Sequence, residues 1–486
     1  MDRLLLVLTF LLAISFLSAQ STLQKKIKDF ATHPNLIHGQ LSVALIDVTT
    51  NQLIAGHRPD KNMIPASSLK VLITGIAMKK LGKDYRFKTA LLYDGNITVD
   101  GTLKGNLIIR GYGDPTLGSH HFAKAESHDV VLKKWTDAIK KAGIKKIEGY
   151  IIGDASYFST QVGGRTWLWE DLGNYYGAGA WGLNFHENLY HLDLKQNNKL
   201  GGTPSIQTVR PKVPNLHLIN ELTQDKRGSG DNAYIFGVPY SYTRFIRGTI
   251  PIGTGIFTVK GSVPDPPFFA AFQLMQNLES VGISTSQRAG SLYQLEREGI
   301  EIGATQVIHT YLSPTLREIV KETNLKSVNL YCEALLRLLG KTEKGDSDPS
   351  KGLEIIMDYL NNNGLPTAGL FLRDASGLSP RNAVSARHLA AYLAFLKKQD
   401  DIFPDFKASL PVGGKSGALK YLFRGTSGEN KVFAKSGGMD RVRSYSGYVK
   451  NKAGKWLAFS IIANNFNGKS ATMRKEMEKL MLAFCQ

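Results

Sequence analysis

Cysteine is scarce in this sequence, with two residues among 486. Cys332 lies in an apolar stretch with helical spacing, and Cys485 is the second residue from the end. Small secreted folds that depend on disulfides need several cysteine pairs, so this pattern excludes a disulfide framework. We expect Cys332 to pack in a core rather than to take part in chemistry.

Long apolar runs are absent beyond the first residues. Residues 4–17 are mostly apolar and follow Arg3. Small residues come next, so we expect residues 1–19 to be a signal peptide that is cleaved after Ala19, with an uncleaved anchor as the alternative. No later segment approaches the roughly 20 apolar residues of a membrane-spanning helix. We therefore expect a secreted chain, periplasmic or associated with the cell envelope, with no integral membrane segment after cleavage.

Acidic residues are fewer than basic ones: 41 Asp and Glu against 60 Lys and Arg give a formal net charge of +19. A positive surface attracts polyanions such as a cell envelope. The basic residues are scattered, and neither an aromatic-flanked basic run nor zinc-finger spacing occurs, so we expect no nucleic-acid partner. With 42% hydrophobic residues, the composition is that of a globular chain of two to four domains.

The two ends of the chain differ in pattern from its middle. Near the start a hairpin is predicted, and near the end three strands and a helix, at residues 41–56, 431–435, 445–449, 456–463 and 471–484. From about Asp84 to Gly299 the chain is rich in Gly, Pro and short strand-like runs, and from Thr310 to Leu339 helical spacing returns. The pattern predicts an α/β (α+β) fold. Residues 20–84 and 300–486 would form one domain, an antiparallel sheet flanked by helices, and residues 85–299 one or more inserted β-rich domains.

Ser67 and Lys70 form the first motif that can carry chemistry. The segment Pro65-Ala66-Ser67-Ser68-Leu69-Lys70 opens an apolar run that predicts a helix with Ser67 in its first turn. Residues three positions apart are neighbours on a helix, so the Lys70 amine can reach the Ser67 hydroxyl. Such a pair is a nucleophile beside its base if the lysine is unprotonated, a state that a second nearby cation favours. A capped helix with a surface lysine is the alternative interpretation.

Ser327-Val328-Asn329 is the second motif, and it directly precedes the helical run from Leu330 to Leu339. The Ser327 hydroxyl can pass a proton to a leaving amine, and the Asn329 amide can hold a peptide backbone and bond Lys70. An ordinary helix cap is the alternative.

Lys435-Ser436-Gly437 is the third motif, between two strand-like segments. Lys435 would supply the second cation, the Ser436 hydroxyl would bind a substrate carboxylate, and Gly437 would let an extended peptide approach closely. The same triplet occurs at Lys415, but there it follows the loop segment Pro411-Val412-Gly413-Gly414, so we favour Lys435.

Three motifs in this order are the signature of penicillin-recognising serine enzymes. The 260 residues between Ser67 and Ser327 exceed what a minimal fold needs. In this long gap between the first two motifs, the chain resembles the D-alanyl-D-alanine carboxypeptidase/endopeptidase family of class C low-molecular-mass penicillin-binding proteins, the DacB-type serine peptidases, whose members carry inserted domains there. Four further stretches are similar to recurring segments of that family, over essentially the whole mature chain: residues 111–117, 153–158, 175–178 and 374–379.

The resemblance implies a penicillin-binding, β-lactamase-like transpeptidase domain and a serine-type D,D-carboxypeptidase, D,D-endopeptidase or both, acting on peptidoglycan stem peptides. It implies no cofactor and no metal, with β-lactams as covalent inhibitors. Ser67 would be the acylated nucleophile and Lys70 its base. The remaining implied roles are proton transfer by Ser327, Asn329 and Lys435, carboxylate binding by Ser436, oxyanion binding by the N–H groups of Ser67 and Gly438, and side-chain recognition by Asp154 and Arg381.

Four positions depart from the family pattern. Ser436 stands for the usual Thr and keeps the hydroxyl, and Val328 stands for a commoner Asp. Gly438 stands where the family often has a hydroxyl residue that also binds the substrate carboxylate, so this position affects the preference for a free C-terminal D-alanine. Pro380 occupies the place of the usual Arg, with Arg381 next to it.

Three alternatives complete the hypotheses. A β-lactamase shares the acylation chemistry, and the large insertion argues against it. A non-catalytic envelope-binding protein could keep the scaffold, but the three motifs are intact. His186 and His191 superficially resemble a zinc helix, yet they are five positions apart rather than four, so we expect no metal there.

Overall fold

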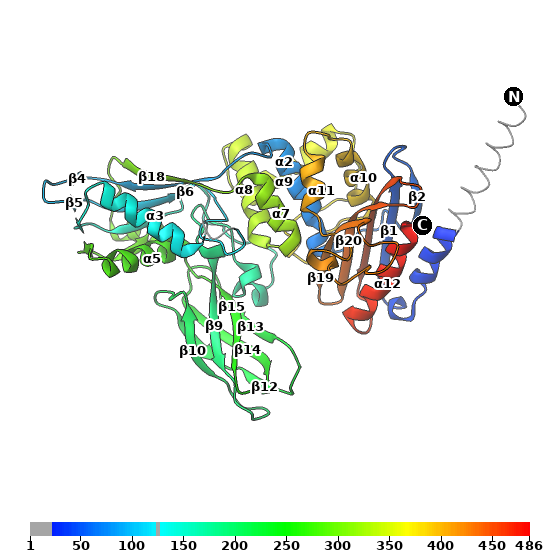
Figure 1. Cartoon of the computed structure of the whole chain (residues 1–486), viewed down its shortest axis with the longest axis horizontal. Helices are drawn as coiled ribbons and strands as arrows, with labels where there is room; N and C mark the ends of the chain where they lie inside the picture. Colours follow the sequence, from blue (N-terminus) through cyan, green and yellow to red (C-terminus); the bar gives the residue numbers. More distant parts are fainter. Residues whose placement is uncertain (1–21, 123–126) are drawn as a thin grey trace, which may run out of the picture. The chain divides into compact units, whose positions relative to one another are not determined.

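The computed structural model of the protein describes residues 22–122 and 127–486 (Figure 1). The expected signal peptide, residues 1–19, lies outside the described residues. The chain divides into two compact units. Unit 1 comprises the residues up to Lys83, Val320–Val328 and Leu353–Gln486, and unit 2 comprises Asp84–Ile319 and Asn329–Gly352.

Unit 1 is built around a five-stranded antiparallel sheet in the order β19-β20-β21-β1-β2. Its strands are β1 (Gln40–Asp47), β2 (Leu53–His57), β19 (Val432–Met439), β20 (Val442–Lys450) and β21 (Trp456–Asn464). Its helices include one at residues 22–31, α2 (Lys70–Leu81), α10 (Ala386–Lys397), α11 (Phe403–Ser409) and α12 (Ser470–Phe484), with the 3-10 turns η1 (Pro34–Leu36), η2 (Ala66–Leu69) and η7 (Gly417–Leu419).

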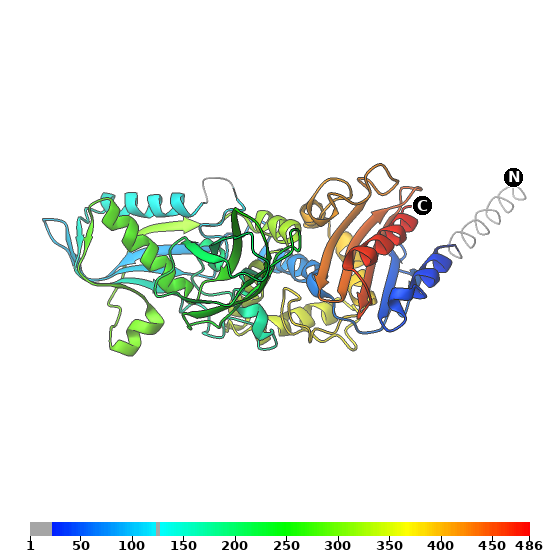
Figure 2. The ribbon, with the colours of Figure 1, turned by 90° about the horizontal axis from the view of Figure 1, so that it is seen from below.

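Helices cover both faces of this sheet, which is why seven of the eight residues of β1 are buried. Val43 and Leu45 of β1 pack in one core cluster with Met473 and Met477 of α12 and with Ile27 from the helix at 22–31. Figure 2 shows α12 lying across the strands. On the other face α10 packs on β1 and β21 and contacts α2, the helix that follows Ser67.

Two expected boundaries differ in the structure. The strand expected to end at Lys435 continues to Met439, because Ser436, Gly437 and Gly438 go on pairing antiparallel with β20. The helical pattern expected from Thr310 begins at Leu316 instead. Thr310 belongs to β18 (Gln306–Leu312), which pairs with β3 (Lys88–Tyr93).

The described residues of unit 2 contain four sheets. The strands of the first two sheets are β17 (Ala289–Ser291), β8 (Ile151–Asp154), β6 (Leu107–Gly111), β3 and β18, then β16 (Ser284–Thr285), β7 (Lys146–Ile147), β5 (Thr102–Lys104) and β4 (Asn96–Ile97). Those of the other two are β10 (Ser205–Arg210), β9 (Leu189–Lys195) and β15 (Ile256–Ser262), then β11 (His217–Asn220), β14 (Thr243–Pro251), β12 (Thr223–Asp225) and β13 (Asn232–Phe236).

Buried apolar side chains join the sheets of unit 2 to its helices, with Trp135 and Phe269 wholly buried among them. The helices and turns are α3 (His128–Lys141), α4 (Trp169–Leu172), α5 (Pro266–Ser280), α6 (Leu292–Leu295), α8 (Asn329–Lys344), η4 (Tyr175–Gly177), η5 (His186–Asn188) and η6 (Glu296–Glu298). Two boundaries between the units fall within helices, one in α7 (Leu316–Lys326) and one in α9 (Pro349–Asn362).

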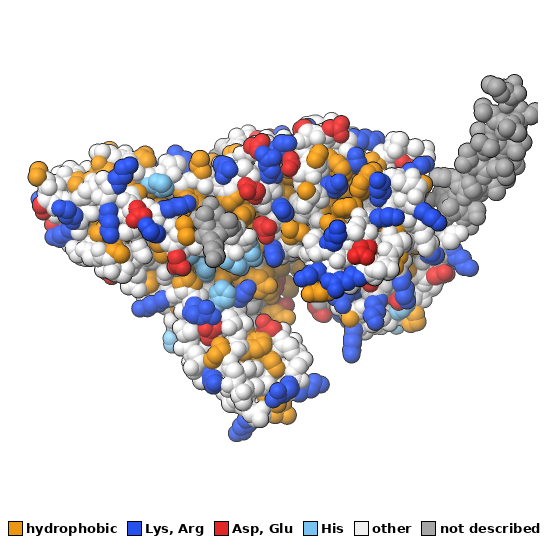
Figure 3. All heavy atoms as spheres, viewed as in Figure 1, with side chains coloured by type: hydrophobic (Ala, Val, Ile, Leu, Met, Phe, Trp, Pro, Cys, Tyr) orange, Lys and Arg blue, Asp and Glu red, His pale blue; other side chains and the backbone are white. Residues whose placement is uncertain are grey.

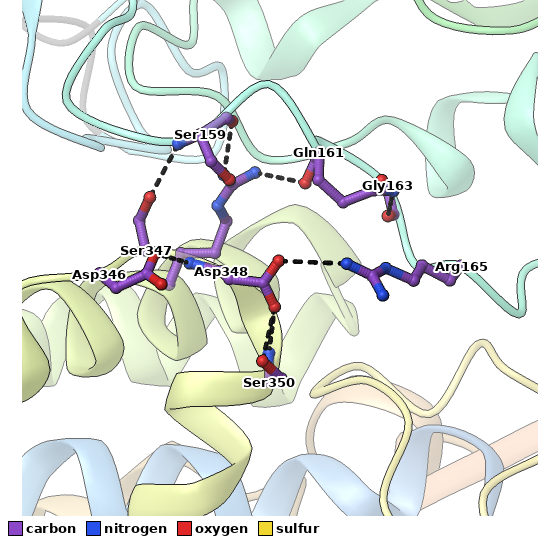
Figure 4. A network of polar contacts seen from close by, with 9 residues as sticks. Ser159, Gln161, Gly163, Arg165, Asp346, Ser347, Asp348 and Ser350 are labelled. Atoms are coloured by element: carbon purple, nitrogen blue, oxygen red, sulfur yellow. Dashed lines mark hydrogen bonds and ion pairs between the residues drawn. The ribbon is translucent and has the colours of Figure 1, made fainter.

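Helix α8 is anchored in unit 2 by a buried cation. Arg337 is 1% exposed, and its guanidinium donates to the carbonyl oxygens of Ser159, Gln161 and Ala180 at 2.6–2.9 Å. Burial lowers the pKa of Arg337 to about 10. Figure 4 shows the surrounding contacts, in which Ser347 accepts from the Ser159 N–H at 2.7 Å and Asp348 pairs with Arg165.

Both cysteines are buried, and no disulfide joins them. Among the described residues, no helix combines the length and the apolar character needed to cross a membrane.

Candidate active site

Ser67 and Lys70 meet at the start of α2. Ser67 lies in the 3-10 turn η2, and the helix proper begins at Lys70. Lys70 Nζ lies 2.8 Å from Ser67 Oγ, and Lys70 is 0% exposed whereas Ser67 is half-buried. A lysine wholly buried beside a hydroxyl is not a solvated surface residue, so the structure excludes the surface-lysine interpretation of this motif.

The loop at residues 374–379, one of the segments similar to the family, contacts the other side of Lys70. Lys70 Nζ donates to the carbonyl oxygen of Ser376 at 2.6 Å. Asp374, 1% exposed, shapes this loop by accepting from the N–H groups of Gly377 at 2.9 Å and Ser379 at 2.6 Å. Asp374 is thus a positioning residue that sequence reasoning missed, although the segment Asp374–Ser379 resembles a recurring segment of the family.

Glycine is required at Gly377 by the closeness of this loop to the nucleophile. Gly377 has φ +79°, and a Cβ there would lie 2.0 Å from the carbonyl oxygen of Ala66 and 3.1 Å from Ser67 N. Ala66 itself has φ +47°, an uncommon conformation for a residue with a side chain. The residue before Ser67 and the glycine of the loop that faces it therefore both have positive φ values, in a region of tight packing.

The edge strand β19 runs beside η2. A Cβ at Gly437 would lie 2.6 Å from Pro65 O and 2.8 Å from Ser68 N. Ser444, opposite Gly437 on β20, donates from its hydroxyl to the same Pro65 oxygen at 2.5 Å. The missing side chain of Gly437 thus makes room for the turn that carries Ser67, and β19 can lie against it.

Lys435 and Ser327 form a second lysine–serine pair. Lys435 Nζ donates to Ser327 Oγ at 2.9 Å and to the carbonyl oxygen of Ser436 at 2.8 Å. Lys435 is 1% exposed. Ser327 has φ +61° in the turn between α7 and α8, a conformation that costs a non-glycine residue about 1 kcal/mol or more. Lys415, the other lysine of such a triplet, lies before η7 in a loop where Ser416 accepts from Val412 N.

Asn329 begins α8 and belongs to unit 2. It is 9% exposed, and its side-chain amide donates to the carbonyl oxygen of Tyr176 at 2.8 Å. The Tyr176 phenol hydrogen-bonds Asp171, whose pKa is raised by burial. Asp171 is therefore a second carboxylate that sequence reasoning overlooked, one residue from the apolar Leu172 and without a motif of its own.

One face of the β19–β20 hairpin carries Ser436, Gly438 and Arg443. Side chains alternate along a strand, so Ser436 and Gly438 lie on the same face of β19, and Arg443 stands opposite Gly438 on β20. Ser436 is half-buried and Gly438 is exposed. A Cβ at Gly438 would lie 3.1 Å from Arg443 Nη1, and Arg443 Nη2 donates to Ser470 Oγ at 2.7 Å. The glycine therefore leaves space next to a guanidinium.

The two residues expected to recognise a substrate side chain lie in different units. Arg381 of unit 1 is exposed, and its backbone N–H donates to Ser379 Oγ at 3.2 Å. Asp154 of unit 2 is 0% exposed, and Arg110 Nε donates to its carboxylate at 2.6 Å. A substrate cation at Asp154 would have to compete with Arg110, so the role of Asp154 stays a prediction.

Comparison with known proteins gives a consistent answer over nearly the whole chain. The family described as D-Ala-D-Ala carboxypeptidase 3 (S13) matches residues 23–484. The D-alanyl-D-alanine carboxypeptidase DacB of Haemophilus influenzae is 26% identical over 432 residues, 87% of this chain and 84% of that protein.

The crystal structure of penicillin-binding protein 4 (dacB) from the same organism has a TM-score of 0.80 at 23% identity and covers 96% of this chain and 99% of its own. A complex of that protein with a β-lactam has a TM-score of 0.74 at 22% identity, covering 96% of this chain and 98% of its own. The predicted fold class is confirmed by these structures.

Proposed function

The chain belongs to the D-Ala-D-Ala carboxypeptidase 3 (S13) family, and we propose that Ser67 is the nucleophile through which it cuts D-alanyl peptide bonds. It is a serine-type carboxypeptidase that acts on peptidoglycan peptides. The observation that carries the assignment of Ser67 is the 2.8 Å contact between its Oγ and the buried Nζ of Lys70.

Lys70 acts as the general base in this proposal. Its amine takes the hydroxyl proton of Ser67 while Oγ attacks the carbonyl carbon of the penultimate D-alanine. The Ser376 carbonyl oxygen, 2.6 Å from Nζ, keeps the amine oriented toward Ser67. The N–H groups of Ser67 and Gly438 bind the oxyanion that develops during attack.

Ser327 and Lys435 complete the first half-reaction. The leaving D-alanine amine needs a proton, and the Ser327 hydroxyl, which accepts from Lys435 at 2.9 Å, passes one to it. The carbon–nitrogen bond breaks and an ester to Ser67 remains. The proton that Lys70 took from Ser67 is passed on to restore the Ser327 hydroxyl, so the Lys70 amine is neutral again. Water then attacks the ester, Lys70 takes a proton from that water and returns it to Ser67 Oγ, and the shortened peptide leaves with a free carboxylate. Asn329 would hold the peptide backbone of the substrate.

We assign the terminal carboxylate of the substrate to Ser436 and Arg443. A hydroxyl and a guanidinium on one strand face are a suitable pair of donors for a carboxylate. Gly438 between them has no side chain that would cover Arg443. This charge complementarity favours removal of a terminal D-alanine over cleavage of a cross-link, in which that carboxylate is absent.

Three further proposals follow from sequence and family membership. Residues 1–19 direct export and are cleaved after Ala19, so the mature chain works in the periplasm or at the cell envelope. Residues 20–84 and 300–486 would form the catalytic part and residues 85–299 the inserted one, although residues 300–319 and 329–352 are grouped with the inserted residues in unit 2. β-Lactams, which mimic the D-alanyl-D-alanine end, acylate Ser67. The β-lactam complex of the Haemophilus influenzae protein supports this last point.

Intact-protein mass spectrometry tests the assignment of the nucleophile. The wild-type chain should gain the mass of one β-lactam, and Ser67→Ala should not. Ser427→Ala, at an exposed serine of unit 1, serves as the matched control and should react like the wild type. An adduct that persists in Ser67→Ala, or a folded wild type that neither reacts nor releases D-alanine, would contradict the proposal and favour a binding protein.

A further inference from the structure

Unit 2 contains a group of histidines that the proposed reaction does not use. Five of the eleven histidines of the chain lie there close together, and Figure 3 shows histidine side chains gathered on the visible face of this unit. Their rings form two sets of contacts. The ring of His120 contacts that of His121 at a centroid distance of 4.1 Å, and the ring of His186 contacts those of His128 and His191 at 5.4 and 6.3 Å.

Two of these histidines converge on one buried carboxylate. His121 Nε2 lies 3.4 Å from Glu187 Oε2, and His120 Nδ1 lies 3.8 Å from Glu187 Oε1. One donor atom from each of the three residues falls within 4.8 Å of the other two. Donors at a zinc ion are about 2.0–2.2 Å from the metal, which in a tetrahedron places them about 3.4 Å apart. The three side chains therefore need only a small rearrangement to share one ion.

Glu187 is held in place from behind. Its Oε1 accepts from the phenol of Tyr331 at 2.9 Å and from the hydroxyl of Ser119. Glu187 is 5% exposed and Tyr331 is wholly buried. Metal-binding carboxylates usually have such outer partners, which orient the oxygen that faces the ion. Tyr331 and Ser119 both bond Glu187 Oε1, and Glu187 Oε2, which lies beside His121, is the oxygen that would bind a metal ion.

The backbone that presents Glu187 is unusual. His186, Glu187 and Asn188 have φ values of +53°, +56° and +55°, three left-handed residues in succession without a glycine. Each such residue costs about 1–2 kcal/mol, so the surrounding structure has to hold the turn. Asn188 does so by donating to Gly179 O at 3.0 Å and to Asn184 Oδ1 at 2.8 Å. Strained backbone of this kind is concentrated at functional sites.

The segment that carries the two histidines is tied to this turn. His186 N donates to Leu117 O at 2.9 Å, and the Asn184 amide donates to Asp114 O at 3.1 Å. His121 N donates to Ser119 Oγ at 3.0 Å, and that same hydroxyl bonds Glu187. The donors are brought together by hydrogen bonds that do not depend on any ion, so the site is preorganised.

We propose that His120, His121 and Glu187 bind a divalent transition-metal ion of the zinc class. Two imidazole nitrogens and a carboxylate oxygen suit zinc, cobalt or nickel better than calcium or magnesium, which prefer oxygen ligands alone. Three protein donors leave at least one position for water. The ion joins the segment at His120 to the turn at Glu187. Sequence spacing pointed away from a metal because it compared His186 with His191, whereas the two donors come from the neighbouring pair His120 and His121.

Metal binding by the full mature chain tests the proposal. We expect chelator-treated protein to take up one equivalent of Zn²⁺ in calorimetry, and Co²⁺ to give the visible absorption of a low-coordinate nitrogen–oxygen site. His121→Ala and Glu187→Gln should each weaken binding at least tenfold. Gln retains an oxygen that accepts from Tyr331 and Ser119, so the fold should survive. His120→Ala, at a side chain that is 43% exposed, is a further variant with little risk to folding.

His217→Ala, at a histidine of the same unit on strand β11, is the matched control and should bind Zn²⁺ like the wild type. The proposal is overturned if the wild type has no saturable site, or if His120→Ala, His121→Ala and Glu187→Gln bind as tightly as the control. Acylation of the metal-free chain by a β-lactam is measured in parallel. Its outcome concerns Ser67 alone, so the two proposals stand or fall separately.

Discussion

Lys435 of strand β19 donates to Ser327 Oγ at 2.9 Å, although 108 residues separate the two in the sequence. Lys70 makes the corresponding contact with Ser67 over three residues. The proposed site thus contains two pairs in unit 1, each of a buried lysine and a half-buried serine. One pair is local in sequence, and the other is formed by tertiary packing. The following predictions separate their contributions.

Replacing Lys70 by Met should remove the base without removing much apolar volume. We expect the rate of acylation by a β-lactam to fall by about 10²- to 10⁴-fold, the range of general-base catalysis. Lys80→Met, at an exposed position of the same helix, should keep the wild-type rate. Stopped-flow or mass-spectrometric acylation kinetics measure both, and equal rates in the two variants would contradict the role of Lys70.

Ser327→Gly should separate the hydroxyl from the left-handed backbone that carries it. Glycine adopts φ +61° without strain, so we expect thermal stability to be retained or slightly increased. Release of D-alanine from a D-alanyl-D-alanine peptide should fall by about 10²-fold or more, because the leaving amine loses its proton donor. Unchanged turnover would mean that the protonation route does not pass through Ser327.

Gly377→Ala should damage the site by steric contact. Its Cβ would lie 2.0 Å from the Ala66 oxygen, in addition to the strain of φ +79°. Gly425→Ala has a similar φ of +69° but nothing within 4 Å, so it isolates the strain, expected at about 1–2 kcal/mol. We predict a lower melting temperature and a larger loss of acylation for Gly377→Ala than for Gly425→Ala. Similar values in both variants would contradict the packing argument.

Arg443→Ala should weaken recognition of a free terminal carboxylate. We expect kcat/KM for a peptide ending in D-alanine to fall at least tenfold, whereas the same peptide with an amidated end should be affected little. Arg441, which bonds Phe466 O and Asn467, is the control position on the same hairpin. An equal loss for both peptides would indicate that Arg443 supports the fold rather than the carboxylate.

Asp265 should make the stability of the chain depend on pH. It is 1% exposed, caps α5 by accepting from Phe268 N, and burial raises its pKa to about 6 from 3.8. A carboxyl with a raised folded-state pKa binds more protons in the folded state. The free energy of unfolding therefore falls as pH rises from about 4 to about 6 and stays lower above, by about 3 kcal/mol.

Asp265→Asn keeps an acceptor for Phe268 N and a donor for Ser291 Oγ, and it should remove this contribution. We expect the variant to gain in melting temperature over the wild type as pH rises from 4 to 7. Asp137→Asn, at an exposed carboxylate of α3, should show no such trend. Burial lowers the pKa of His186 to about 3, so this histidine makes the free energy of unfolding rise with pH up to about 6.5, opposite to the effect of Asp265. Because both variant and wild type contain His186, the difference between their melting temperatures reports on Asp265 alone.

Much of the site could be predicted because the motifs are short. Ser67 and Lys70 are three residues apart, and a helical turn brings such residues together whatever the rest of the chain does. The hairpin that carries Lys435 followed from two alternating strands joined by a short connection. Its exact extent did not, because continued pairing of Ser436 to Gly438 with β20 depends on the partner strand.

Other parts of the site lay beyond sequence reasoning. The contact of Ser376 O with Lys70 spans 306 residues, and the meeting of His120 and His121 with Glu187 spans more than sixty. No spacing rule relates such positions. The ion pair between Asp154 and Arg110, which limits the expected role of Asp154, is likewise visible only in the structure.

From the sequence we could predict the proximity of Ser67 and Lys70 and the class of fold, because a helical turn brings residues three apart together and hydrophobic periodicity indicates the secondary structure. Lys435 was already favoured over Lys415 from the sequence, and its contact with Ser327 is visible only in the structure. The structure was also needed to show that Gly377 and Gly437 pack against the turn of Ser67, and which buried carboxylates face cations or histidines. The physical reason is that a contact between distant residues depends on how whole elements pack, and that packing is set by buried surfaces contributed from many parts of the chain at once.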